Sequence, residues 1–167
     1  KRLTPYSIRD AALSTSGLLN GKIGGPSVKP YMPPGIWRSI SNASYKQDKG
    51  DKIYRRGMYT YWRRTVPPPT MMTFNAAARE ICIVRNDHTT TPLQALTMMN
   101  NKTFVEAARF LGERMMKPRG QRPRQRVAEA FRRVTSRVPS KAELDLLMKD
   151  FRFYQKDFRK NAKAASQ

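Results

Sequence analysis

The sequence predicts a mainly α-helical protein, with an irregular Pro/Gly-rich N-terminal half followed by a small helical bundle. Several segments place apolar residues three and four positions apart and open with helix-capping residues, which indicates amphipathic helices. The stretch between residues 24 and 69 instead contains clusters of proline and glycine, which interrupt helices. We expect residues 1–167 to be a single domain or a piece of a larger protein. Its expected parts are a loop-rich helical part at 3–101, a three-helix part at 102–160 and a tail at 161–167.

The first expected helix begins at Thr4-Pro5, because threonine is a good N-cap and proline suits the first helical position. Its apolar positions continue to Leu18-Leu19, and Gly17 or Asn20-Gly21 ends it. Residues 40–52 are polar and turn-like, and we predict a flexible or partner-ordered loop there. From Tyr54 to Arg64 the aromatic spacing favours a short helix that stops at the prolines 67–69, although a strand is the competing prediction.

Helix signals are strongest in the second half of the chain. Thr91-Pro92 repeats the N-cap and first-turn proline, and the Asn100-Asn101 pair interrupts the helix that follows. Apolar stripes then run from Phe104 to Met115 and from Val127 to Val138. Ser140 and Glu143 form a capping box before a third stripe that reaches Phe158. We expect these three amphipathic helices to pack together.

The charge of the chain restricts the partners that it can have. Lys and Arg number 33 against 12 Asp and Glu, which gives a net charge of +21. Such an excess repels itself unless anions offset it, so nucleic acid, acidic proteins, anionic lipid and sulfated polysaccharide are acceptable partners. The alternative is a solvated basic surface that serves solubility. A mean hydropathy of -0.70, with no long apolar run, argues against a transmembrane helix.

No catalytic, metal or cofactor site can be recognised in the sequence. Cys82 is the one cysteine, and its place in the apolar run Ile81-Cys82-Ile83-Val84 predicts an inert core residue. His88 is the one histidine, which supports neither a zinc site nor a catalytic triad by itself. The remaining candidate groups are carboxylates without paired spacing, namely Asp10, Glu80, Asp87 and Glu106. Whether the parent protein is an enzyme stays open.

Two basic segments are candidate binding surfaces. The first mixes arginines, which grip carboxylates and phosphates, with aromatic rings, which can stack on bases or sugars. The second is a proline-spaced loop of the kind that contacts phosphate backbones. For the first segment the alternative is a core element whose aromatic rings are buried and whose arginines extend to solvent. For the second, the alternative is a solvated loop that binds nothing. The candidate residues are Arg55, Arg56, Tyr59, Trp62, Arg63 and Arg64 in the first segment, and Arg119, Arg122, Arg124 and Arg126 in the second.

Several blocks together resemble a C-terminal domain of unknown function from large planctomycete and verrucomicrobial proteins. The blocks are residues 7–19, 24–28, 54–65, 74–79, 89–96 and Asn100, and the resemblance runs over roughly residues 3 to 150. It implies an exported or periplasmic parent protein, larger than this chain, with a cytochrome c domain that carries haem chemistry elsewhere. The chain departs from the family pattern at Asn75, where an aspartate is usual, and at Asn86-Asp87, where arginines are usual. The loss of the acid at Asn75 weakens any proposal of a metal or base there.

The shared blocks suggest a structural role for their polar residues. We expect Arg9, Asp10, Arg79 and Arg85, with the arginines at 55 and 56, to form partly buried ion pairs that lock loops to helices. We expect Gln94 and Asn100 to satisfy backbone groups. The resulting hypothesis is a non-catalytic basic module that docks onto acidic protein domains or a polyanion. The alternative is a nucleic-acid-associated subunit of a ribonucleoprotein particle, which would be cytoplasmic.

Overall fold

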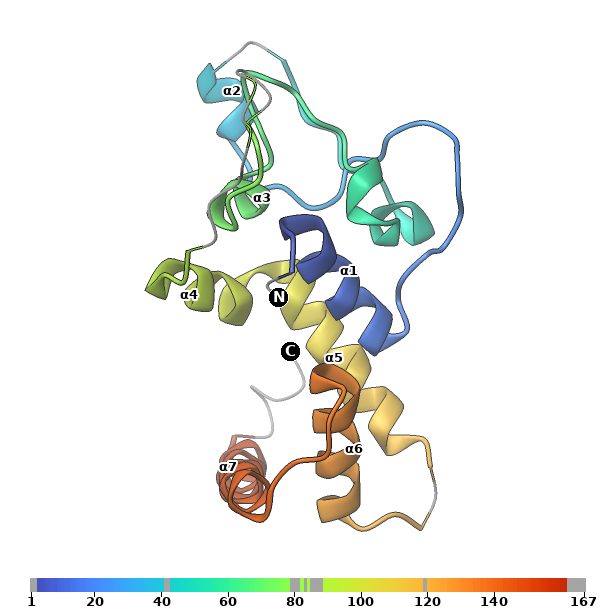
Figure 1. The fold of residues 1–167 in the computed structure, drawn as a ribbon, viewed down its shortest axis with the longest axis vertical. Coiled ribbons are helices and arrows are strands. Elements are labelled where there is room, and N and C mark those ends of the chain that lie inside the picture. The colour runs from blue at the N-terminus through green and yellow to red at the C-terminus, as the bar shows by residue number, and fades with distance from the viewer. Residues whose placement is uncertain are drawn as a thin grey trace. The chain divides into compact units, whose positions relative to one another are not determined.

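The computed structural model describes residues 3–40, 43–78, 82, 84, 89–118 and 120–161, and these are mainly helical, as predicted (Figure 1). The chain divides into two compact units, residues 1–111 and 112–167. The α-helices are α1 (Pro5–Ser16), α2 (Ile36–Ile40), α3 (Pro69–Thr73), α4 (Pro92–Asn100), α5 (Lys102–Met116), α6 (Pro123–Thr135) and α7 (Lys141–Lys160). Two 3-10 helices, η1 (Gly50–Tyr54) and η2 (Gly57–Tyr59), lie between α2 and α3.

Helix α1 begins and ends at the residues that the sequence indicates. The Thr4 side chain accepts a hydrogen bond from the backbone N–H of Ser7, and Pro5 occupies the first turn. Gly17 ends the helix with a φ of 83°, a left-handed conformation that glycine adopts without a steric penalty. Leu13 points inward and is fully buried. The prediction for this element is confirmed.

The segment from residue 50 to residue 66 differs from both predictions for it. Instead of an aromatic helix or a strand, it contains η1 and η2 joined by extended residues. It pairs with the preceding loop through two isolated parallel bridges, Asn20 with Arg55 and Val28 with Thr60, and the described residues contain no regular strand. The aromatic spacing misled the prediction because these side chains pack against distant segments rather than along one helix face.

An aromatic cluster forms a core beside this segment. Met32, Trp37 and Val66 are buried, and Tyr45 and Tyr61 pack against them. The Trp37 ring centroid lies 5.2 Å from that of Tyr45 and 5.9 Å from that of Tyr61. Trp37 lies on α2, a helix that the sequence analysis did not predict. The loops of the proline- and glycine-rich stretch therefore pack around buried aromatic rings.

The later helices follow their capping signals. Thr91 and Gln94 form a capping box at the start of α4, and Ser140 and Glu143 form one at the start of α7. Ser136 ends α6 with a φ of 58°, so Val138 lies beyond the helix whose apolar stripe it was expected to extend. Helix α6 packs on α7 within the second unit. The boundary between the two units falls inside α5, after Leu111.

Candidate functional site

Arg9 and Asp10 join α1 to the segment that contains η1 and η2. Arg9 is 6% exposed, and its guanidinium donates hydrogen bonds to the backbone carbonyls of Arg55 at 2.6 Å and Ile53 at 2.5 Å. The Asp10 carboxylate accepts a hydrogen bond from the backbone N–H of Gly57 at 2.7 Å. The Arg9 and Asp10 side chains approach each other to 3.8 Å. Neutral carbonyls, more than the ion pair expected from the sequence, therefore hold the Arg9 cation.

Burial and the neighbouring residues shift the pKa of Arg9 in opposite directions. Loss of water around the guanidinium lowers the pKa of Arg9, whereas the negative charge of Asp10 raises it. Arginine nevertheless stays protonated, because its unperturbed pKa is above about 12. The site therefore carries a permanent buried cation.

Arg55 holds the preceding loop in the same way. It is 5% exposed, and its guanidinium donates to the carbonyls of Pro26 at 2.9 Å, Gly24 at 2.5 Å and Lys22 at 3.2 Å. The guanidinium carbon lies 3.8 Å from the centre of the Tyr59 ring, a cation–π contact. The Tyr59 hydroxyl in turn accepts a hydrogen bond from the backbone N–H of Gly24 at 2.8 Å. The groups of Arg55 and Tyr59 that an external ligand would contact are thus engaged inside the molecule.

The other candidates of the aromatic–arginine segment divide by exposure. Arg56 and Arg64 are exposed. Trp62 is half-buried, and its indole N–H donates to the carbonyl of Ala78 at 3.2 Å. The Arg63 guanidinium lies 5.1 Å from the centre of the Trp37 ring. Of this segment, Arg56 and Arg64 are the cations presented to solvent.

The second basic segment also uses part of its charge internally, and only its first part is a loop: α6 begins at Pro123, so Arg124 and Arg126 lie in the first turn of that helix. Arg124 forms an ion pair with Asp145 of α7 at 2.7 Å. The Arg126 guanidinium donates to the Met116 sulfur at 3.0 Å. Arg122 is exposed at the end of the loop. Arg119 lies outside the described residues.

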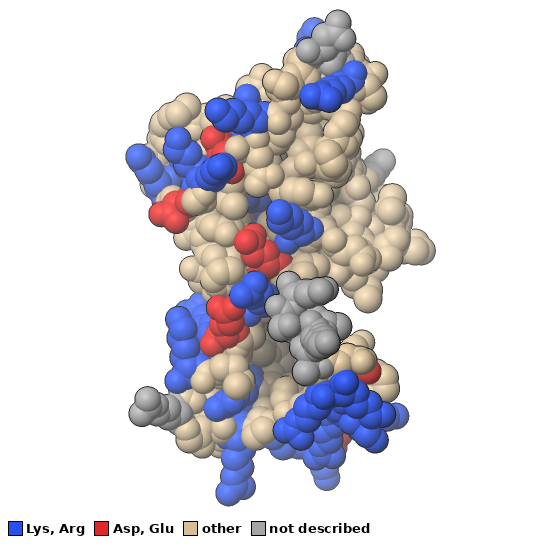
Figure 2. Space-filling view, turned by 180° about the vertical axis from the view of Figure 1, so that it is seen from behind, with Lys and Arg blue, Asp and Glu red and all other residues tan. Residues whose placement is uncertain are grey.

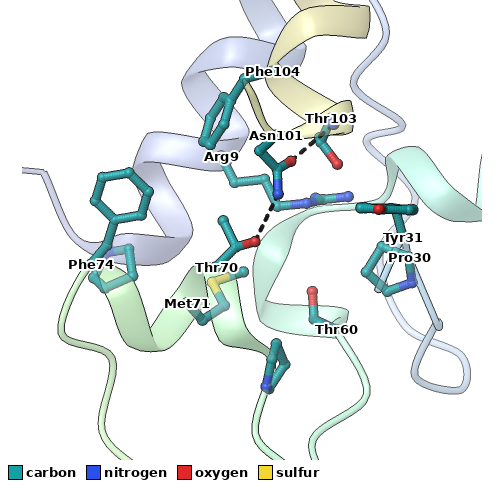
Figure 3. Close-up of a pocket in the computed structure, with 12 residues that line it drawn as sticks. Arg9, Pro30, Tyr31, Thr60, Thr70, Met71, Phe74, Asn101, Thr103 and Phe104 are labelled. Atoms are coloured by element: carbon teal, nitrogen blue, oxygen red, sulfur yellow. Dashed lines mark hydrogen bonds between the residues drawn. The ribbon is translucent and has the colours of Figure 1, made fainter. Parts of the chain in front are cut away.

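A small cavity lies beside Arg9, between α1, α3 and the start of α5 (Figure 3). Its volume is about 40 Å³, which suffices for ordered water but is far below the several hundred cubic ångströms of a substrate pocket. The hydroxyl of Thr60 points into it, and the amide of Asn101 donates to the hydroxyl of Thr70 at 2.9 Å (Figure 3). The residues that line the cavity therefore connect α1, α3 and the start of α5, and the cavity itself is too small for an organic substrate.

The polar residues of the shared blocks mostly contact backbone atoms. The Gln94 side chain donates to the carbonyl of Thr73 at 3.0 Å, which joins α4 to α3. The Asn100 side chain donates to the carbonyl of Leu96 at 3.0 Å, within α4. Arg79 and Arg85 lie outside the described residues, as do Glu80, Asp87 and His88. Cys82 is exposed, so its expected burial in the core is wrong: a short apolar run does not by itself specify burial.

Two residues that organise this region, Asn101 and Gly57, were not predicted from the sequence. The side-chain amide oxygen of Asn101 accepts a hydrogen bond from the backbone N–H of Thr103 at 2.9 Å, so Asn101 caps α5 as well as ending α4. An asparagine directly before a periodic apolar stripe is the sequence signal that could have predicted this N-cap. Gly57 lies against Tyr6 so closely that a methyl group there would approach the Tyr6 Cα to 3.2 Å. A single sequence contains no signal for that contact.

The described part of the chain shows neither a metal-binding group nor a membrane-spanning helix. Among these residues no three His, Cys, Asp or Glu side chains come together as a metal-binding group. None of the described helices combines the length and the apolar character that crossing a bilayer requires.

A family of known sequences matches most of the chain. The model of a family described as "PSD1: Protein of unknown function (DUF1553)" matches residues 1–151. No curated protein and no solved structure matches the chain.

Proposed function

We propose that this chain, which belongs to the PSD1 family of proteins of unknown function (DUF1553), is a non-catalytic basic module that docks onto an acidic protein domain or a polyanion. The net charge of +21 is the observation that carries the proposal. Its self-repulsion opposes folding, and an anionic partner would offset that cost. The proposal concerns what this module contacts and leaves any chemistry to the rest of its parent protein.

The distribution of the cations supports a surface role for most of them. Arg9 and Arg55 are buried and hold backbone carbonyls, so they stabilise the fold. On the face shown in Figure 2, Lys and Arg side chains gather in the lower part and are scattered over the rest, with fewer Asp and Glu side chains among them. Exposed cations such as Arg56, Arg64 and Arg122 are accessible to an anionic surface. Long-range attraction between such cations and an anionic surface does not require a pocket.

For the parent protein we propose export and a cytochrome c domain elsewhere in the chain. The resemblance of the sequence to exported, cytochrome-c-linked proteins supports this part of the proposal. The gene tests it directly. An upstream signal peptide and a CxxCH motif are expected, and a complete reading frame without either would contradict this part of the proposal.

Binding to three polyanions at graded salt tests the docking function. The chain should bind heparin and an acidic protein at low salt, and the affinity should fall as salt rises because bound counterions are released. A steep salt slope on RNA or DNA with no binding to heparin or acidic protein would favour a nucleic-acid-associated protein instead. Absence of binding to all three at low ionic strength would contradict the proposal.

A pair of matched variants separates the contribution of the candidate contact cations from that of overall charge. One variant neutralises candidate contact cations and the other neutralises three exposed lysines elsewhere, so both lose the same charge. The two are R56Q/R64Q/R122Q and K46Q/K49Q/K52Q. We expect the first to weaken binding about tenfold more than the second, on the basis of roughly 0.5 kcal/mol for each exposed ionic contact. Equal losses would show that net charge alone drives the interaction.

A further inference from the structure

The C-terminal half of α7 extends beyond the residues that cover its first half. Met148 is buried, and Leu144 and Leu147 are half-buried, where α6 packs on α7. From residue 151 to residue 160 every side chain is exposed. The apolar stripe nevertheless continues through Phe151, Tyr154 and Phe158 at spacings of three and four residues. Half of an amphipathic helix therefore presents its apolar side to solvent.

Three aromatic side chains form a connected cluster on this exposed half. Phe153, Tyr154 and Phe158 are 67%, 57% and 56% exposed. The ring centroids of Phe153 and Tyr154 lie 5.4 Å apart, and those of Tyr154 and Phe158 lie 6.4 Å apart. Contiguous exposed apolar groups mark an interaction site, whereas single ones do not.

Basic side chains occupy the side of the helix away from the stripe of Phe151, Tyr154 and Phe158. Lys149, Arg152, Lys156 and Arg159 recur at spacings of three and four residues, which places them along one side of the helix. Figure 2 shows Lys and Arg gathered densely over the second unit. Asp150 and Asp157 are the acidic residues of this half, and they reduce its positive charge without cancelling it.

We infer that the C-terminal half of α7 docks onto an anionic lipid surface, with its aromatic rings at the level of the headgroups. A helix with aromatic residues on one side and Lys and Arg on another lies in the plane of a bilayer interface, and its binding depends on apolar burial together with attraction to anionic lipid. Tyr154 suits that boundary because its ring is apolar while its hydroxyl can stay in water, and Phe153 and Phe158 add apolar area that the bilayer can bury.

This inference goes beyond the docking proposed above, because it requires the rings as well as the charge. A soluble polyanion would engage the basic side chains and leave the aromatic cluster in water. A second copy of the chain would cover the rings, but it would bring together two proteins of charge +21. An anionic lipid surface satisfies both features at once.

Co-sedimentation of the full chain with vesicles tests the inference. The vesicles are phosphatidylcholine alone and phosphatidylcholine mixed with phosphatidylglycerol. Binding is expected only to the anionic mixture, at about 1 kcal/mol for each basic residue near the surface. The variant F153A/Y154A/F158A should lose about tenfold or more in vesicle affinity and keep its affinity for heparin. Alanine maintains helix propensity, so α7 should stay folded, which far-UV circular dichroism checks.

A control variant removes three exposed apolar side chains from the first unit. We expect I23A/M58A/M99A to bind anionic vesicles as the parent chain does. A second test, D150N/D157N, should strengthen vesicle binding because it removes the negative charges beside the rings. Equal vesicle binding by the parent chain and the aromatic variant would overturn the inference. So would heparin binding without vesicle binding, a result that leaves the docking function intact. Loss of a dimer in the aromatic variant, measured by light scattering, would show that a second copy covers the face instead.

Discussion

At the scale of single residues, Arg55 offers the sharpest prediction about stability. Replacing it with alanine leaves the carbonyls of Pro26, Gly24 and Lys22 without their donor. Because hydrogen bonds from charged donors each contribute about 1.5–3 kcal/mol, R55A should lower the free energy of unfolding by about 3 kcal/mol or more. R55K should recover little, since an ammonium group lacks the planar fork. Urea denaturation measures this, with the exposed R56A as a control expected to change stability by less than about 0.5 kcal/mol. Similar losses in R55A and R56A would contradict the assignment.

Two glycines in different surroundings should respond to alanine with opposite signs. A Cβ at Gly57 would approach the Tyr6 Cα to 3.2 Å and its Cβ to 3.3 Å, so G57A should destabilise the protein by about 1–3 kcal/mol. Gly112 lies within α5, and apart from its chain neighbours and the backbone of its own helix no atom lies within 4 Å of the added methyl group. G112A should therefore stabilise the helix by about 0.5–1 kcal/mol. Thermal unfolding of both variants checks the sign, and a destabilised G112A would show that the surroundings of α5 are incorrectly described.

At the scale of elements, the start of α7 makes stability depend on pH. Glu143 accepts hydrogen bonds from Arg137 at 2.6 Å and 2.9 Å and from the backbone N–H of Ser140 at 2.9 Å. The Arg137 guanidinium and the Ser140 cap lower the pKa of Glu143 from 4.5 to about 2. A depressed folded-state pKa means that the stabilisation is present above pH 4.5 and is lost as pH falls towards 2. The melting temperature of E143Q should change less over that window than that of the parent chain, and parallel curves would contradict this.

The elements that the sequence predicted well are those with local signals. Thr4-Pro5, Thr91-Pro92 and the pair Ser140 and Glu143 specify helix starts within a few residues of themselves, and the structure places helices there. The segment around η1 and η2 was predicted incorrectly because its conformation depends on Arg9, more than 40 residues away in the chain. That Arg9 and Arg55 would hold carbonyls, and which ones, could not be predicted, since a guanidinium accepts any carbonyl that the fold brings to it. The burial of Cys82 was predicted incorrectly for a similar reason, because an apolar run does not specify which segments will cover it.

At the scale of the whole molecule, the net charge of +21 makes folding depend on ionic strength. The Debye length falls from about 10 Å at 0.1 M salt to about 3 Å at 1 M, so added salt weakens repulsion among the excess cations. Salt also weakens exposed ion pairs such as Arg124 with Asp145 and Arg133 with Glu129. Each of these contributes at most about 1 kcal/mol, so we expect the loss of repulsion to outweigh them.

The melting temperature should therefore rise as NaCl increases at neutral pH, measured by circular dichroism in the absence of any polyanion. The variant K46Q/K49Q/K52Q carries three fewer positive charges at exposed positions, so its melting temperature should rise less steeply with salt. Heparin at low salt should raise the melting temperature of the parent chain further, because a ligand that binds only the folded state stabilises it by mass action. A melting temperature that falls with NaCl would mean that attractive ion pairs outweigh the repulsion, and the need for an anionic partner would then lose its physical basis.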